Sequence, residues 1–146
     1  MNFDLLSGKF SSAEARQLNP LVLAYIGDAV YEVFIRTYCI ELNRDMLVHK
    51  LHKKVVSFVK AHSQSEFMKG IEELLTEDEM GIFKRGRNTK SSVPKNADVQ
   101  EYRMATGFEA VIGYLYITEQ SERLNYILNE VIRINTEREQ GESKWA

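Results

Sequence analysis

The stretch PLVLAYIGDAVYEVFIRTYCI, residues 20–40, is apolar over most of its length. Its charged residues Asp28, Glu32 and Arg36 follow one another at intervals of four. Residues four apart lie on the same face of a helix, so these three form one narrow polar stripe. A helix that is apolar on nearly all other sides is buried on most of them. The stretch therefore predicts a helix at the centre of a helical domain or at a subunit interface.

A second stretch, MATGFEAVIGYLYIT at residues 104–118, repeats this pattern with Glu109 as its single formal charge. It also contains Gly107 and Gly113, and Gly27 directly precedes the acid of the first stretch. Each glycine costs about 1 kcal/mol relative to alanine inside a helix. We therefore expect another backbone to approach closely at these glycines.

Helix signals dominate the whole chain, and no alternating strand pattern bounded by turn residues occurs. Asn19 followed by Pro20 is typical of a helix N-terminus. The predicted fold class is all-α, with about six helices in one domain spanning 1–146 and loose ends at 1–18 and 137–146. The expected helices cover, approximately, residues 20–41, 46–62, 63–75, 76–85, 98–117 and 121–136.

Three of the inner boundaries follow from local signals. Ser63 with Glu66, and Thr76 with Glu79, have the spacing of a capping box, in which side chain and backbone bond each other reciprocally. Gly86 is placed to end the fourth helix. The segment NTKSSVPKN, residues 88–96, is the one sustained stretch in the middle of the chain with the composition of a loop. A long connection between helices at this place is a candidate functional loop.

The composition excludes several classes of protein. With 146 residues, 44% hydrophobic and 27% charged, the chain matches a globular domain and not a disordered tail. The single Cys39 excludes a disulfide scaffold and a four-cysteine zinc site, and predicts a small core residue in a reducing compartment. The start, MNFDLLSGKF, lacks the order of a signal peptide, and no apolar run reaches the ~18 residues of a membrane helix. We expect a soluble cytoplasmic protein.

The net charge of −2 comes from 19 basic and 21 acidic residues, but these are segregated along the chain. Residues 46–65 and 81–97 contain no acid, whereas acids crowd into 66–79. The first of these segments holds four lysines and all three histidines, and the second holds five basic residues. Because the distribution of charge decides what a surface can hold, these segments could bind a polyanion in spite of the net charge.

A buried carboxylate needs a partner, because it otherwise protonates. For Asp28 and Glu109 the partner could be a basic side chain such as Arg36 or Arg103, shared hydrogen bonds, or a divalent cation. If the two apolar helices pack side by side, both acids can converge on one Mg²⁺, which prefers oxygen ligands. Such a site leaves room for a phosphodiester and a water molecule. An ion pair or simple exposure on a solvated stripe remains the alternative.

The strings YIGDAVYE at 25–32 and GFEAVIGYLYI at 107–117 resemble the two acidic helices of the ribonuclease III family. With YRMATGFEA around the second acid and no double-stranded-RNA-binding domain after Glu119, the chain is similar to the Mini-ribonuclease III branch of that family. The resemblance implies a homodimer with two active sites along one duplex-binding groove. It also implies Mg²⁺-dependent cleavage of double-stranded RNA, with Mn²⁺ as a substitute, and maturation of large-subunit (23S) ribosomal RNA precursor.

The resemblance carries over only two acids as catalytic and metal-binding residues, Asp28 and Glu109. The family usually has a Glu four positions before the Asp, where this chain has Ala24, and an Asp three before the Glu, where it has Thr106. These departures leave the number of metal ions open. Candidates for supporting roles around the site are Glu32, Tyr102 and Thr106, with a pairing to Arg36 favoured for Glu32.

The segment KRGRNTKSSVPK, residues 84–95, is the expected RNA contact, since Lys and Arg neutralise phosphates and small polar residues let the backbone follow a strand. An ordinary solvated loop is the alternative. His49 and His52 are three apart, but without a nearby Cys or acid they do not predict a metal site. The RNA-binding candidates are Lys84, Arg85, Arg87, Asn88, Lys90, Lys95, Lys53 and Lys54.

Two other functions remain open at this point. One is a catalytically silent, ribonuclease III-like module for RNA binding or ribosome assembly, which would bind RNA without Mg²⁺-stimulated cleavage. The other is an all-α nucleotide pyrophosphohydrolase, an enzyme class that also uses helix carboxylates and Mg²⁺ but usually has several Glu on paired helices. The leading hypothesis is a metal-dependent endoribonuclease acting on double-stranded RNA.

Overall fold

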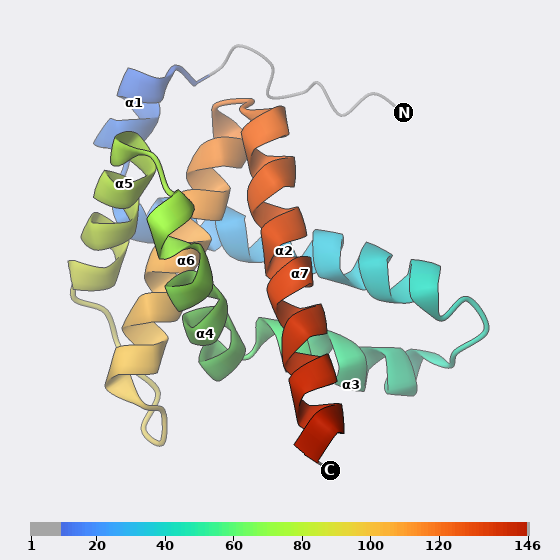
Figure 1. The fold of residues 1–146 in the computed structure, drawn as a ribbon. Coiled ribbons are helices and arrows are strands. Elements are labelled where there is room, and N and C mark those ends of the chain that lie inside the picture. Colours follow the sequence, from blue (N-terminus) through green and yellow to red (C-terminus); the bar gives the residue numbers. More distant parts are fainter. Residues whose placement is uncertain (1–9, 146) are drawn as a thin grey trace.

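The structure is a computed structural model that describes residues 10–145, and every regular element within that range is helical (Figure 1). This confirms the all-α class, with one more α-helix than the six expected. The elements are α1 (Ser12–Gln17), α2 (Pro20–Leu42), α3 (Val48–Val59), α4 (Ala61–Ile71), the 3₁₀ turn η2 (Glu72–Leu74), α5 (Glu77–Asn88), α6 (Val99–Ile117) and α7 (Ser121–Trp145).

The two ends expected to be loose are partly helical. The additional helix α1 begins with a capping box: the Glu14 backbone N–H donates to Ser11 Oγ over 3.1 Å, and the Ser11 N–H donates to the Glu14 carboxylate over 3.3 Å. At the other end α7 continues to Trp145. Residues 12–17 and 137–145 are therefore helical, while residues 1–9 and 146 lie outside the described part of the chain.

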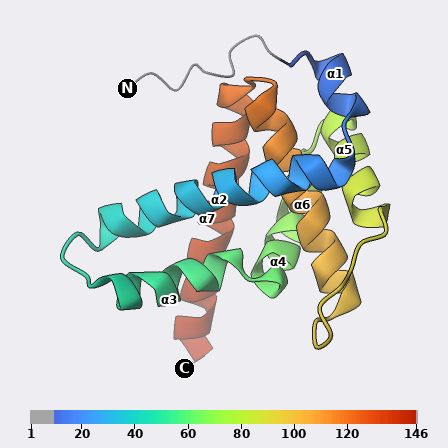
Figure 2. The same cartoon turned by 180° about the vertical axis from the view of Figure 1, so that it is seen from behind.

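Helix α6 is the central helix of the domain. Nearly all its residues from Ala105 to Ile117 are buried, with α2, α4, α5 and α7 packed around it. Figures 1 and 2 show α2 crossing α6 steeply, while α5 and α4 lie along another side. The core is dominated by large side chains such as Tyr31 and Phe108, whose rings meet edge to face at 5.1 Å. Burial of each such side chain stabilises the fold by about 1.5–3 kcal/mol.

The crossing of α2 and α6 is made backbone to backbone at two glycines. A Cβ added to Gly27 would overlap the Glu109 carbonyl oxygen and lie 2.8 Å from the Gly113 nitrogen. A Cβ added to Gly113 would overlap the Leu23 carbonyl oxygen. The close approach expected from the sequence is thus confirmed, and it explains why both helices accept the cost of a glycine.

Helix α2 is less buried than its composition suggests. Its inner face is in the core, but Tyr25 is 81% exposed and Val33 66%, and Val22 and Ile40 are also about half exposed. The helix at residues 20–40 was predicted to lie at the centre of the domain or at a subunit interface, and the centre is occupied by α6 instead. The outer face of α2, composed of Val22, Tyr25, Val33 and Ile40, is an apolar surface that the rest of the protomer leaves uncovered.

Some predicted helix boundaries are confirmed because their causes are local. The Asn19 side chain accepts a hydrogen bond from the Leu21 N–H at 2.9 Å, with Pro20 in the first position of α2. Thr76 and Glu79 form the expected capping box at the start of α5. These boundaries depend only on residues within one turn of each other.

Two other boundaries were predicted wrongly. Helix α4 begins at Ala61, so Ser63 is not a cap; it is buried and donates a hydrogen bond to the Ser57 carbonyl oxygen over 2.5 Å. Gly86 does not end α5, which continues to Asn88. A Cβ at Gly86 would lie 3.0 Å from the Ala110 Cβ, so this glycine serves the packing of α5 against α6.

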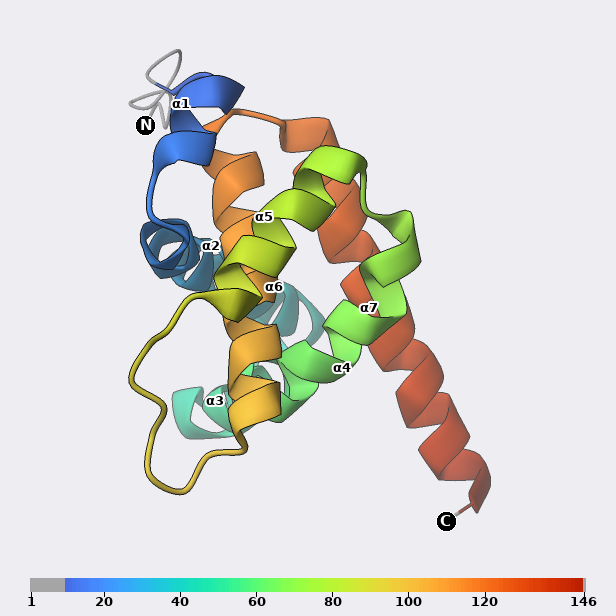
Figure 3. The ribbon, with the colours of Figure 1, turned by 90° about the vertical axis from the view of Figure 1, so that its left-hand side faces the viewer.

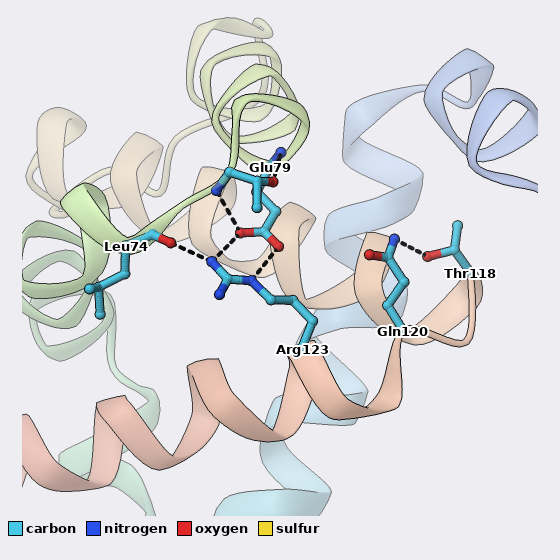
Figure 4. Close-up of polar contacts among 6 residues, drawn as sticks. Leu74, Glu79, Thr118, Gln120 and Arg123 are labelled. Carbon is cyan, nitrogen blue, oxygen red and sulfur yellow. Dashed lines mark hydrogen bonds and ion pairs between the residues drawn. The ribbon is translucent and has the colours of Figure 1, made fainter.

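A buried ion pair joins α5 to α7 (Figure 4). Arg123 binds both carboxylate oxygens of Glu79, over 2.7 and 2.8 Å, and also donates to the Leu74 carbonyl oxygen. Glu79 is only 2% exposed, so its charge is balanced by this two-pronged contact and by its capping bond to the Thr76 N–H. The pair fixes the start of α7 relative to α5.

Cys39 is buried, as expected. Among residues 10–145, no helix has the length and apolar character required to span a membrane.

The glycine crossing predicts opposite effects for the same substitution at two positions. Gly27→Ala places a methyl group in the backbone of α6 and should lower the free energy of unfolding by about 3 kcal/mol or more. Gly81→Ala, at an exposed helical position with nothing within 4 Å, should raise it by about 0.5–1 kcal/mol. Urea unfolding followed by circular dichroism measures both. Equal effects of the two substitutions would contradict the close approach.

Candidate functional site

The structure brings the two lone acids, Asp28 and Glu109, into one cleft of about 530 Å³. The cleft lies between α2 and α6, and is bordered by the α3–α4 corner and by the loop that joins α5 to α6. Asp28 follows Gly27 directly, and Glu109 is the residue whose carbonyl group Gly27 contacts. The close crossing of the two helices therefore sets the two carboxylates side by side.

Glu109 is the less exposed of the two acids, and its environment disfavours ionisation. Burial, then a hydrogen bond with Asp28 and the negative charges of Asp28 and Glu32, raise the pKa of Glu109 to about 9. The first cause is loss of hydration, and the others come from acids on the facing helix. At neutral pH Glu109 therefore keeps its proton when nothing else neutralises the acids of the cleft.

No basic side chain in the described part of the chain forms an ion pair with either acid. Of the two partners considered from the sequence, Arg36 bonds Glu32 over 2.9 Å and Arg103 is exposed. The ion pair between Arg36 and Glu32 confirms the pairing that the sequence favoured for Glu32. Two facing carboxylates without a cation of the protein's own form a donor set suited to a hard divalent cation.

The positions where this chain departs from the family pattern also face the cleft. Ala24 and Thr106 line it, together with Tyr102. The Thr106 hydroxyl donates to the Tyr102 carbonyl oxygen over 3.0 Å, which leaves the hydroxyl oxygen as an acceptor. No group of three or more His, Cys, Asp or Glu residues suited to one metal ion occurs among residues 10–145. The acidic part of the site consists of the two carboxylates.

The basic loop candidates lie beside the cleft. Ser91 and Ser92 of the connecting loop line it, and Figure 3 shows this loop extending away from the helices between α5 and α6. The lysines on either side of these serines, Lys90 and Lys95, are exposed, as is Lys84 on α5. A polyanion in the cleft would therefore lie close to uncompensated positive charge.

Two arginine candidates at the end of α5 are engaged by the protein itself. Arg85 donates to the carbonyl oxygens of Arg16 and Leu18 over 2.5 and 3.3 Å, and so holds the connection between α1 and α2. Arg87 lies with its guanidinium 5.3 Å from the centre of the Phe83 ring and donates to the Asn88 side chain over 3.1 Å. Arg85 thus has a structural role that the sequence did not indicate.

Lys53 and Lys54 are not at the cleft. They line a separate cavity of about 370 Å³ between the end of α2, α3 and α7, together with Asn135 and Glu139. The sequence placed these lysines on the same helix as the other basic residues of 46–65. It did not indicate which face of that helix would lie towards the cleft.

Sequence reasoning missed Gln64, a buried residue of α4 that lines the cleft. The signal was present as three consecutive polar residues, Ser63 to Ser65, all of which are buried. The capping box expected at Ser63 concealed it, because that interpretation already explained the polar Ser63 as the start of a helix.

Comparisons with known proteins agree with this architecture. The profile of the ribonuclease III domain matches residues 21–120. The chain is 56% identical over 140 residues to the Mini-ribonuclease 3 of Clostridium tetani, covering 95% of this chain and 93% of that protein. It is 46% identical over 124 residues to the Mini-ribonuclease 3 of Staphylococcus aureus, covering 83% and 92%. A crystal structure of a Fusobacterium nucleatum protein superposes with a TM-score of 0.74 at 36% identity, covering 81% of this chain and 96% of that one.

The raised pKa of Glu109 predicts how stability depends on pH. The folded protein keeps this proton up to about pH 9, whereas the ordinary carboxyl value is 4.5. The free energy of unfolding should therefore fall as the pH rises through that interval, because the folded state binds more protons. Glu109→Gln should flatten this dependence, while Glu41→Gln, at an exposed position of α2, should not. Unfolding titrations in metal-free buffer between pH 5 and 9 measure the slopes; parallel slopes for wild type and Glu109→Gln would contradict the burial of a protonated Glu109.

Proposed function

Because the chain belongs to the ribonuclease III family, we propose that it is an endoribonuclease that hydrolyses double-stranded RNA in the cleft between α2 and α6. The observation that carries the proposal is the meeting of Asp28 and Glu109 in one cleft beside exposed lysines. The acids supply the chemistry, and the neighbouring positive charge supplies affinity for a phosphate backbone. We also propose that the whole chain, 1–146, forms a single catalytic domain.

The cleft fits a divalent cation, and we propose Mg²⁺, with Mn²⁺ as a substitute. The carboxylates of Asp28 and Glu109 would hold it, and the Thr106 hydroxyl oxygen is a further acceptor on the same wall. The fit rests on two facing acids that lack any basic partner in the described residues, and on the raised pKa of Glu109 between them. When bound, such a cation polarises a phosphodiester and favours attack by water.

The two acids have different tasks in this proposal. Asp28 is exposed and can reach a cation or substrate without a change of fold. Glu109 must first release its proton, because burial and the neighbouring acids hold its pKa at about 9. The activity should therefore rise with pH through the range in which a cation competes with that proton.

The basic residues around the cleft are proposed to hold the RNA. Lys90 and Lys95 on the loop and Lys84 on α5 are exposed, and the half-buried Arg87 and the polar Asn88 lie at the end of α5. Lys53 and Lys54 lie at a different cavity and would contact only a more distant part of a long duplex. Arg85 supports the site through its bonds to the α1–α2 connection.

We propose that the chain acts as a homodimer through the apolar outer face of α2. Tyr25 and Val33 on this face are 81% and 66% exposed, which is costly for large apolar side chains in water. Tyr25 also lines the cleft, so a partner packed on this face would lie beside the site. Two clefts in such a dimer would each cut one strand of a duplex.

The finer biological role is proposed from the similarity to Mini-ribonuclease 3 proteins. On that basis the substrate is large-subunit (23S) ribosomal RNA precursor, and the enzyme works in the cytoplasm. Preferential cutting of the precursor over an unrelated duplex of equal length would support this role, and equal cutting would count against it.

The catalytic proposal predicts that Asp28→Asn and Glu109→Gln each abolish cleavage of a long duplex RNA, with a loss of about 10³-fold or more. Both variants should still fold and bind the duplex, because each substitution keeps the shape of the side chain. Asp45→Asn, at an exposed turn between α2 and α3, is the matched control and should keep full activity. The measurement is cleavage on denaturing gels with Mg²⁺ or chelator.

A fully active Asp28→Asn enzyme would contradict this assignment. Binding of the duplex by the wild type without any Mg²⁺-stimulated cleavage would instead identify the protein as a silent RNA-binding module.

The electrostatic proposal predicts that replacing Arg87, Lys90 and Lys95 together by Gln weakens duplex binding about tenfold or more at moderate salt. The slope of log affinity against log salt concentration should also become less steep by about 2–3, since each lost phosphate contact removes roughly one from its magnitude. Fluorescence anisotropy across a salt titration measures both. A control with the same loss of charge away from the cleft replaces Arg44, Lys50 and Lys69. If this control changes the slope as much, the loop is not the RNA contact.

The dimer proposal predicts that Val33→Asp yields a monomer at micromolar concentration, because a buried, unpaired carboxylate is costly at an apolar interface. Val48→Asp, at an 80% exposed position at the start of α3, should leave the dimer intact. Sedimentation velocity gives the masses. A wild-type chain that sediments as a monomer would contradict the proposal.

A further inference from the structure

Gln64 lies at the cleft but is not explained by the acid pair. It occupies the first turns of α4, is only 2% exposed and lines the same cleft as Asp28 and Glu109. A polar side chain this deeply buried is normally bonded on both its donor and its acceptor side. In Gln64 only the donor side, the amide nitrogen, is bonded.

The amide nitrogen of Gln64 has a structural role at the end of α3. The last carbonyl oxygens of a helix have no partner within it and need donors from elsewhere. Here Ser63 donates to Ser57, Tyr31 to Phe58 over 3.0 Å, and Gln64 Nε2 to Val59 over 2.9 Å. Because a carbonyl oxygen can only accept, this bond fixes which end of the amide is nitrogen.

The other end of the amide, Oε1, has no hydrogen-bond partner among the described residues. An unsatisfied buried acceptor is costly, so a donor arriving in the cleft gains more than it would in water. Phosphate oxygens only accept and cannot provide that donor. On the RNA backbone the donor is the ribose 2′-hydroxyl, the group that distinguishes RNA from DNA.

We propose that Gln64 Oε1 accepts a hydrogen bond from a ribose 2′-hydroxyl of the strand bound in the cleft, and that Gln64 is thereby a specificity-determining residue for RNA over DNA. The inference rests on the proposed function, since it requires an RNA strand beside Asp28 and Glu109. The buried carbonyl selects the ribose, while the amide nitrogen keeps the α3–α4 corner in place.

The test combines one variant with single-atom changes in the substrate. A short RNA duplex is prepared in versions that each lack one 2′-hydroxyl, at successive positions across the cleavage site. Wild type should cut one of these versions about five- to tenfold more slowly than the all-ribose duplex, the size of one net hydrogen bond. Gln64→Met should cut the all-ribose duplex more slowly and be insensitive to the 2′-deoxy change at that position.

Two further variants separate this role from structural support. Gln64→Glu keeps an acceptor and should keep the 2′-deoxy sensitivity even if it loses the bond to Val59. Gln140→Met, at an exposed position of α7, is the matched control and should behave as wild type throughout. A residue that only caps α3 would change thermal stability and rate on every substrate equally, with unchanged 2′-deoxy sensitivity.

Each outcome decides the question. Equal 2′-deoxy effects in wild type and Gln64→Met at every position overturn the Gln64 assignment and leave the nuclease proposal standing. If Gln64→Met does not fold, a wild type that is insensitive at all positions overturns the assignment, and loss of sensitivity in folded Gln64→Glu does the same. A wild type that cuts no all-ribose duplex with Mg²⁺ overturns the proposed function and this inference together.

Discussion

The arrangement of the molecule depends on the contact between Gly27 and the backbone of α6. Gly113 lies against the carbonyl group of Leu23 in the same way, so at these two glycines the helices meet without intervening side chains. Close packing of this kind is rigid, because any added Cβ must displace backbone rather than a flexible side chain. The adjacent acids, Asp28 and Glu109, are therefore held together by the fold itself.

That closeness has an electrostatic cost, which is visible in the raised pKa of Glu109. An ionised carboxylate in this position lowers the stability of the fold unless a cation or a proton neutralises it. Functional sites often retain such costs because the perturbed group is useful there. Ala24 and Thr106 are the uncharged neighbours of these acids on the cleft wall, so the pair supplies the acidic character of the cleft among the described residues.

The sequence predicted the parts of the structure that have local causes. The caps at Asn19 and Thr76 and the close approach at Gly27 follow from neighbouring residues or from one conspicuous pattern. The predictions failed where a distant contact decided the outcome. Ser63 bonds the end of the preceding helix instead of capping its own, and Gly86 packs on α6 instead of ending α5.

The same distinction applies to the candidate site. The two acids could be found from their isolation in apolar helices, because a lone charge in a long apolar stretch is conspicuous in a sequence. The role of Arg85 at the α1–α2 connection and the separate cavity at Lys53 depend on how helices pack, which residue spacing does not contain. Gln64 was missed because its importance lies in an unpaired atom that only the folded chain defines.

The central claim is that the helix crossing builds a cation site from Asp28 and Glu109. The most direct measurement is an anomalous difference map from crystals of the protein soaked in Mn²⁺. A peak within coordination distance of both carboxylates is expected, and it should be lost in crystals of Asp28→Asn. No peak between these residues at a Mn²⁺ concentration that supports cleavage, or a peak held by other residues alone, would contradict it.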